Sequence, residues 1–370
     1  MSPANVSDDD FREILAQTRH FVRTAVVPRE AEILAEDKVP DDLRDQAKKM
    51  GLFGYAIPQE WGGLGLDIAQ DVELAMELGY TSLALRSMFG TNNGIAGQVL
   101  VGFGTDDQKA RWLEPIASGE VVASFALTEP GAGSNPSGLK TKAVADGPEK
   151  DRAWVINGRK QYITNAPVAD LFIVFARTRP ADADGPGIAV FLVPANTPGV
   201  EIGVKDAKMG QEGAWTSDVN FTDVRVGHDT LIGGSVDIGY RAAMTSLARG
   251  RIHIAALAVG SAQRALDESV AYAATATQGG TPIGLTTVRS ISPRRATAPS
   301  EYSTNLPKPG RAGVGNRVES ERTRGLFTAC APAFPPPRSR PDYPPPPGGC
   351  PRRGQARRRG AHPGRSSARR

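Results

Sequence analysis

The 370-residue chain contains little cysteine and little histidine, with two and four residues respectively. Cys330 and Cys350 lack a C-x-x-C spacing and have no histidine close by, which excludes the common zinc and dithiol motifs. No apolar run reaches 18 residues, so the sequence predicts no transmembrane helix. The N-terminus is polar and acidic and lacks the apolar core of a signal peptide. We therefore expect a cytoplasmic protein without a metal site.

Net positive charge is absent from most of the chain and is concentrated in its last segment. Residues 285–370 hold 17 arginines and one lysine against four acids, a net charge of +14, so the other residues carry −10. The same segment contains 15 of the 29 prolines and shows neither helical nor strand periodicity. Such a composition cannot bury enough apolar surface to offset chain entropy. We expect residues 285–370 to form a disordered, Arg/Pro-rich tail.

Residues 1–120 are predicted to form an all-helical N-terminal domain. The stretch "DDDFREILAQTRHFV" has acids in its first turn and places apolar residues near one helical face, namely Phe11, Ile14, Leu15, Phe21 and Val22. Helical spacing continues through residues 67–104, and "TDDQKARWLEPIASGE" is predicted to begin with an N-cap at Thr105.

Residues 121–228 are predicted to form a β domain. Short runs rich in Val, Ile, Phe and Tyr, such as "WVINGRKQYIT" and "LFIVFART", alternate with Gly, Pro and Asn. About six strands without intervening helices favour an antiparallel barrel or sandwich over a parallel sheet. The pair Asn157-Gly158 is typical of a tight hairpin turn.

Residues 229–284 are predicted to form part of a C-terminal helical domain. Small and aliphatic residues recur at three- and four-residue steps from Gly239 onward, which indicates one helix of roughly 35–40 residues, or ~55 Å. Such a helix needs partner helices to bury its apolar face, and without them the exposed stripe predicts poor solubility. The complete prediction is an α+β multidomain protein with an incomplete helical bundle.

The stretch "FALTEPGAGSNPSG" follows an apolar run and is rich in glycine, as phosphate-binding loops are. A dinucleotide fingerprint requires G-x-G-x-x-G followed by a helix. Here the glycines are Gly131, Gly133 and Gly138, Pro136 intervenes, and "LKTKAVADG" is typical of another strand. The Rossmann interpretation therefore fails, and shape alone leaves an ordinary glycine-rich turn as the alternative.

Three motifs occur in order: "LTEPGAGSNPSGLKTKAV", "VINGRKQYITNAPVADLFIVFART" and "KMGQEGAWTSDVNFTDVRV". Together they resemble the acyl-CoA dehydrogenases, which are FAD enzymes with a helical N-terminal domain, a middle β domain and a C-terminal four-helix bundle. The resemblance runs from about Asp8 to Gly284. Composition and periodicity independently indicate the same α–β–α order.

The resemblance implies flavin-binding roles for five residues. Leu127 and Thr128 would hydrogen-bond the pyrimidine edge of the flavin, and Gly133 would permit close backbone contact. Tyr162 takes the place of an aromatic residue that packs by the isoalloxazine ring. Thr164 lies where a hydroxyl reaches N5. Without the surrounding motif, Tyr162 and Thr164 would be ordinary strand residues.

The resemblance also implies two substrate-binding residues. Ser134 would line the approach of the pantetheine chain, and Arg251 matches an arginine near the active site on the long helix. The alternative for Arg251 is a solvated helix residue. His253 is more typical of a packed or surface position than of a catalyst, and Asp267 and Glu268 are expected to be surface acids.

The implied reaction is α,β-dehydrogenation of an acyl-CoA thioester, in which a glutamate removes the α-proton and the β-hydrogen leaves as hydride. In most of the family this glutamate lies beyond the region of resemblance, and in a minority it immediately precedes the arginine matched by Arg251. That position holds Gly250 here, so the catalytic base is unknown. The resemblance implies an enzyme, and an active chain and a chain that has lost its activity both remain open. The resemblance further implies an electron-transferring flavoprotein as acceptor and a homo-oligomeric assembly, which the incomplete bundle leaves open.

Two hypotheses address the tail. In the first, the reading frame changes near Gly284, which would explain the sudden Arg/Pro/Gly excess and the simultaneous end of the family resemblance; translation of the two other frames tests it. In the second, the protein is a dehydrogenase-like scaffold whose basic tail binds nucleic acid or an acidic surface. The charges lie on no recognisable fold and aromatic residues for base stacking are few, which argues against the second.

Overall fold

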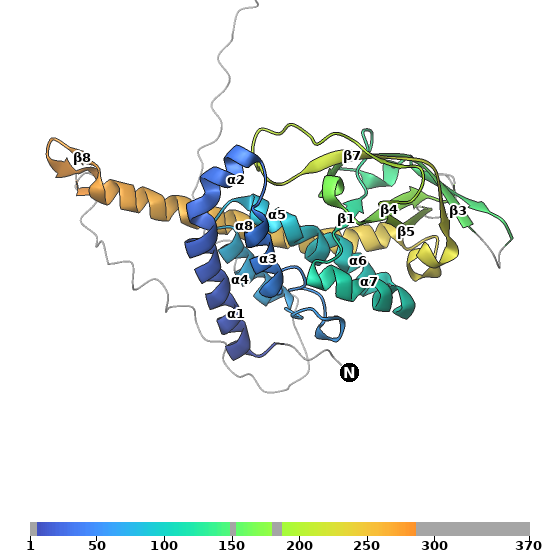
Figure 1. The fold of residues 1–370 in the computed structure, drawn as a ribbon, viewed down its shortest axis with the longest axis horizontal. Helices are drawn as coiled ribbons and strands as arrows, with labels where there is room; N and C mark the ends of the chain where they lie inside the picture. The colour runs from blue at the N-terminus through green and yellow to red at the C-terminus, as the bar shows by residue number, and fades with distance from the viewer. Residues whose placement is uncertain (1–5, 149–152, 180–186, 286–370) are drawn as a thin grey trace, which may run out of the picture. The chain divides into compact units, whose positions relative to one another are not determined.

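The computed structural model describes residues 6–148, 153–179 and 187–285 (Figure 1). The predicted tail, apart from Leu285, lies outside these residues, as does any binding function of its arginines. The N-terminal helices are α1 Asp8–Phe21, α2 Glu30–Glu36, α3 Asp41–Lys49, α4 Ile68–Leu78, α5 Leu83–Gly90, α6 Ala96–Phe103 and α7 Asp106–Ser118. Two π-helical turns, Val22–Val26 and Thr91–Ile95, connect neighbouring helices.

Side-chain caps fix where several of these helices begin. Ser7 accepts a hydrogen bond from the Asp10 N–H at the start of α1. The predicted cap Thr105 forms a capping box with Gln108 at the start of α7, and Asp67 forms another with Gln70 at the start of α4. Each box satisfies two backbone N–H groups that have no partner within the helix.

The β domain is a seven-stranded sheet with the order β1-β4-β2-β3-β7-β6, in which β5 pairs with β4. Its strands are β1 Ala123–Ala126, β2 Lys142–Asp146, β3 Ala153–Thr164, β4 Leu171–Arg177, β5 Ile188–Pro194, β6 Val200–Ile202 and β7 Thr216–Gly227. Most neighbours are antiparallel, as predicted, but β1 and β2 both meet β4 in parallel. The fold class is thus confirmed, with a mixed sheet at β4.

Asn157-Gly158 does not form the predicted hairpin. Strand β3 continues through both residues, with a register shift against β7 between Ile156 and Gly158. The Asn157 side chain exchanges hydrogen bonds with Asp223 across the shift. A Cβ at position 158 would lie 2.4 Å from the Thr141 Oγ1, so glycine is required here by close strand approach rather than by a turn.

Strands β4 and β5 are buried on both faces, which explains their nearly continuous apolar sequences. One face, including Ile173, Phe175 and Val190, packs against residues of α6, α7 and α8. The other, including Phe172 and Phe191, packs inside the β domain. This alternation follows from the two-residue period of a strand.

Helix α8, Gly239–Thr275, spans 37 residues and confirms the predicted long helix. It is followed by the short strands β8 Thr277–Gln278 and β9 Thr281–Pro282. Figure 1 shows its last turns extending beyond the other helices. No helix in the described ranges is long and apolar enough to cross a membrane.

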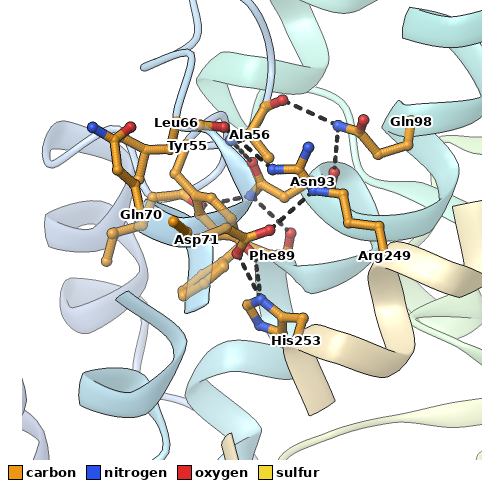
Figure 2. A network of polar contacts seen from close by, with 12 residues as sticks. Tyr55, Ala56, Leu66, Gln70, Asp71, Phe89, Asn93, Gln98, Arg249 and His253 are labelled. Atoms are coloured by element: carbon orange, nitrogen blue, oxygen red, sulfur yellow. Dashed lines mark hydrogen bonds and ion pairs between the residues drawn. The ribbon is translucent and has the colours of Figure 1, made fainter. Parts of the chain in front are cut away.

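A buried polar network attaches α8 to α4 (Figure 2). Asp71 of α4 receives hydrogen bonds from Arg249 at 3.0 Å and from the His253 Nδ1 at 2.7 Å. Tyr55 stacks on the His253 ring with an interplanar angle of 8°. Asn93, from the π-helical turn before α6, donates to the Leu52 and Phe89 carbonyls close by. The network fixes the position of α8 along α4.

Candidate functional site

A cavity of about 390 Å³ lies where β1, the glycine-rich loop, the end of β3, the second π-helical turn and the first half of α8 meet. Its lining includes every residue that the motifs predicted for flavin or substrate, namely Leu127, Thr128, Gly133, Ser134, Tyr162, Thr164 and Arg251. A separate cavity of about 270 Å³, lined by residues that include Lys38 and Trp215, contains none of them. Segments up to 160 positions apart in sequence, from Thr91 to Arg251, therefore converge on the first cavity.

One stripe of α8 forms a wall of the cavity. Tyr240, Met244, Leu247 and Arg251 follow one another at steps of four, three and four residues, which places them on one helical face. The Arg251 side chain is exposed at this wall and forms no hydrogen bond or ion pair with any described residue. The cavity thus has an apolar wall with one free guanidinium.

The ends of β1 and β3 form the opposite wall. The Gln161 N–H donates to the Thr128 carbonyl at 2.9 Å, and β3 shifts register against β7 between Lys160 and Ile163. Within this bulge Tyr162 has a φ of 59° and its side chain is 63% exposed. A left-handed backbone is strained for an aromatic residue, and such strain is concentrated at functional sites. The bulge directs the Tyr162 ring to the cavity rather than into the sheet.

Backbone and side-chain hydrogen bonds fix the conformation of the glycine-rich loop. Glu129 and Ala132 exchange two backbone hydrogen bonds, and Arg177 of β4 donates to the carbonyls of Ser137 and Leu139. An added Cβ at Gly133 would meet no atom within 4 Å. Packing within the chain therefore does not require glycine at position 133. Since Gly133 lines the cavity, the missing side chain leaves space on the cavity side of the loop.

A buried ion pair lies beneath the same loop. The Lys160 side chain is fully buried, and its Nζ lies 2.8 Å from Glu129 Oε1. Glu129 also accepts the backbone N–H groups of Lys140 and Thr141. Burial lowers the pKa of Lys160 to about 8, although Glu129 acts in the opposite direction. Burial disfavours the Glu129 carboxylate, but Lys160 and the N–H donors outweigh it and lower the pKa of Glu129.

No carboxylic acid lines the cavity among the described residues. Gly250, at the alternative base position, is buried, and an added Cβ there would lie 3.2 Å from Ile95 Cγ2. Ile95 itself lines the cavity, so position 250 faces its wall. His253 is packed against Asp71 outside the cavity, and Asp267 and Glu268 are exposed on α8, as expected from the sequence.

The sequence motifs do not identify the apolar wall residues or the buried position of Lys160. The wall residues could have been found from their spacing on the predicted long helix. For Lys160, strand alternation from Trp154 and Ile156 predicts an inward-facing position, and a buried lysine requires an acid. Glu129, in the first motif, is that acid. Charged residues in strands are usually solvated, so neither residue stood out.

Comparison with known proteins places this architecture in a family. The N-terminal domain model of the acyl-CoA dehydrogenases matches residues 8–120, the middle-domain model residues 124–224 and the C-terminal-domain model residues 237–288. The chain belongs to the acyl-CoA dehydrogenase family, a family of flavoprotein oxidoreductases. The resemblance inferred from the motifs is confirmed, and the C-terminal match ends close to Gly284, where the resemblance stopped.

Individual relatives support the assignment. An acyl-CoA dehydrogenase of Bacillus subtilis is 36% identical over 266 residues, which are 72% of this chain and 68% of that protein. The caffeyl-CoA reductase-Etf complex subunit CarC of Acetobacterium woodii is 36% identical over 242 residues, 65% of this chain and 62% of that protein. The solved glutaryl-CoA dehydrogenase of Mycobacterium smegmatis in complex with FADH2 has a TM-score of 0.69 at 29% identity, covering 77% of this chain and 70% of that one. The chain thus spans about two thirds of these relatives.

Proposed function

We propose that the cavity binds the isoalloxazine ring of FAD together with the thioester end of an acyl-CoA. The observation that carries this proposal is the convergence of the seven motif-predicted residues on one cavity. Family membership supports it, since a solved relative at 29% identity holds FADH2. A ring placed here would lie between the β1–β3 wall and the α8 wall.

The residues present fit a flavin. The hydroxyls of Thr128, Ser134, Tyr162 and Thr164 form no hydrogen bond with described residues, although all four residues line the cavity. The Thr128 N–H likewise has no acceptor among the described residues. The open space above Gly133 allows close approach to the loop backbone. Unpaired hydroxyl and N–H donors next to backbone without a side chain suit a planar ring that has carbonyl oxygens on one edge.

The two walls of the cavity would contact different parts of the flavin and the substrate. A bound flavin supplies the acceptor for the β-hydrogen of the substrate. Thr128 and Leu127 would hold the pyrimidine edge, Thr164 would hydrogen-bond near N5, and Tyr162 would shield the ring from water. Phe125, Met244 and Leu247 provide apolar surface for an acyl chain, and Ser134 and Arg251 would bind polar parts of the thiol ester arm.

A base for the α-proton is not among the cavity-lining residues described. We therefore propose that this chain binds flavin and acyl-CoA but does not dehydrogenate the substrate at a family rate. An added Cβ at position 250 would lie 3.2 Å from Cγ2 of Ile95, which lines the cavity, so Gly250→Glu is the variant that would bring a carboxylate close to the cavity.

The test is a visible spectrum of the purified chain reconstituted with FAD, followed by anaerobic addition of butyryl-CoA. We expect a flavin spectrum that is perturbed by the acyl-CoA but bleaches slowly in the natural sequence and faster in Gly250→Glu. Gly131→Glu, an exposed loop change with open space around it, is the control for added charge. Absence of FAD binding would refute the proposal.

We further propose an electron-transferring flavoprotein as the electron acceptor. The support is the Acetobacterium relative, which is a subunit of an Etf complex. Rapid mixing of the photoreduced holoprotein with an electron-transferring flavoprotein should show electron transfer by the loss of the reduced spectrum. Transfer no faster than to dissolved oxygen would contradict this acceptor.

A further inference from the structure

The Lys160–Glu129 pair contacts the site through one peptide group. Besides Glu129, the Lys160 Nζ donates to the Leu127 carbonyl oxygen at 3.1 Å. A trans peptide has its C=O and N–H pointing in opposite directions. The Thr128 N–H therefore points away from Lys160. Since Thr128 lines the cavity and its N–H has no described acceptor, this amide is presented to the cavity.

The pair is arranged asymmetrically about this peptide. The Lys160 ammonium is the member that hydrogen-bonds the Leu127 carbonyl. The Glu129 carboxylate instead accepts the Lys140 N–H at Oε2 and the Thr141 N–H at Oε1, the oxygen that also binds Lys160. A cation bound to the carbonyl polarises the peptide and strengthens its N–H as a donor. In a buried setting this effect is larger than in water.

We propose that the buried Lys160–Glu129 pair orients and polarises the Leu127–Thr128 peptide, so that the Thr128 N–H binds the pyrimidine edge of the flavin and favours its reduced state. Lys160 is thus a positioning residue that acts through the peptide. The proposal rests on the proposed function, since it requires a flavin in this cavity. Negative charge accumulates on the pyrimidine edge on reduction, so a stronger donor there stabilises the reduced form.

The pair also accounts for features that packing alone leaves unexplained. A buried ion pair is commonly no more stabilising than apolar residues of the same volume. Here the Lys160–Glu129 pair lies beside the glycine-rich loop. The Thr128 N–H at the start of this loop has no acceptor among the described residues. The pair links the end of β1 to the end of β3, because Lys160 of β3 binds the Leu127 carbonyl and the neighbouring Gln161 N–H binds the Thr128 carbonyl. These contacts fix the two strands that form this wall of the cavity.

The test removes both charges together, because a single change would leave one buried charge without its partner. The double variant Glu129→Gln/Lys160→Met is compared with the natural chain and with Val219→Ala. Val219 is buried and lies directly opposite Lys160 in the β3–β7 register, but it does not line the cavity. It is therefore a matched control for general loosening of the sheet.

Three quantities are measured: FAD affinity by fluorescence, the reduction potential of the bound flavin, and the urea midpoint. We expect the double variant to bind FAD about tenfold more weakly and to have a more negative potential, because the Thr128 N–H becomes a weaker and less well oriented donor without the charge on the Leu127 carbonyl. Val219→Ala should lower the urea midpoint without moving the potential. A double variant whose potential equals that of the natural chain overturns the inference.

The pH dependence provides an independent readout. Burial lowers the pKa of Lys160 to about 8, and Glu129 is the charged group that faces it. Above that pH the lysine loses its charge, so the potential of the natural chain should fall more steeply between pH 7 and 9 than that of the double variant. Equal slopes would overturn the inference. A natural chain that binds no FAD would instead overturn the proposed function, and this inference with it.

Discussion

Helix α8 has two faces with opposite environments. One face, which includes Ala243, Gly250, His253, Leu257 and Gly260, is buried against α4, α6 and the sheet. The other carries Ile252, Val259 and Leu266 at seven-residue steps, and these side chains are 47%, 52% and 56% exposed. A seven-residue apolar repeat is the pattern of a helix that packs against a further helix.

The two faces of α8 differ in whether described residues pack against them. The buried face holds the helix in register, and the neighbouring stripe of Tyr240, Met244, Leu247 and Arg251 lines the cavity. No helix among the described residues covers the exposed stripe. The site wall and the register of α8 are therefore set by one face, and the other face should be replaceable without consequence for the fold.

The largest effect is expected from removing the buried interaction of Asp71 with Arg249 and His253. Asp71→Asn removes the charge that Arg249 and His253 share, and Asp71 is almost fully buried. Removing one partner of a buried pair costs about 3–5 kcal/mol in unfolding free energy. Urea unfolding followed by circular dichroism measures the change.

Asp267→Asn is the matched control for this change, since Asp267 accepts a hydrogen bond from Tyr80 on the exposed part of α8. It should leave the urea midpoint unchanged. Equal losses from both substitutions would contradict the division between the two faces.

A smaller loss is expected from separating the α4 and α8 backbones. A Cβ at Gly260 would lie 2.0 Å from the Met76 carbonyl oxygen, so Gly260→Ala forces the helices apart. Overpacking of this kind costs about 1–3 kcal/mol. Gly102→Ala in α6, where an added Cβ meets no atom within 4 Å, should instead be neutral or stabilising because alanine favours helix. If Gly260→Ala is also neutral in urea unfolding, the close approach is not required.

How much of this organisation could be predicted from sequence depends on the range of the interaction. Local signals located the Thr105 cap, the strands and the 37-residue helix, because caps and periodicity are properties of neighbouring residues. The prediction of a hairpin at Asn157-Gly158 was wrong, because the same dipeptide that suits a tight turn also suits a bulge that Thr141, just before β2, approaches closely. The outcome was decided by a partner that the local sequence does not specify.

The site residues divide in the same way. Motifs named seven residues of the cavity, since family resemblance carries three-dimensional information. They did not reveal that Lys160 is joined to Leu127 and Glu129, or that Asp71 is joined to His253 across 182 positions. Those contacts arise from packing between distant segments.

A smaller effect is expected from pH. Burial lowers the pKa of His253 despite its hydrogen bond to Asp71, and the charges of Arg86 and Arg249 act in the same direction as burial. Because its folded pKa lies below the unfolded value of about 6.5, the unfolded chain binds the proton first as pH falls. Stability should therefore decrease below about pH 6.5.

The buried His253 Nε2 has no partner among the described residues, which is consistent with a cost for its protonation. Unfolding free energies measured from pH 7.5 to 5.5 should fall less in His253→Gln than in the natural chain. Tyr55, which contacts the ring, is kept in both proteins. Identical pH slopes would assign the acid sensitivity to other groups.

The smallest effect on stability is expected from the exposed stripe. Val259→Gln/Leu266→Gln replaces two half-exposed apolar side chains with a good helix former, so the unfolding free energy should change by no more than about 0.5 kcal/mol. Sedimentation velocity should at the same time show less self-association, because the apolar repeat available to another helix is interrupted. The matched change on the buried face, Leu257→Gln, should unfold the chain, since Leu257 is 3% exposed. A large loss of stability in the stripe variant would mean that Val259 and Leu266 are covered in solution, and the two faces of α8 would then be equivalent.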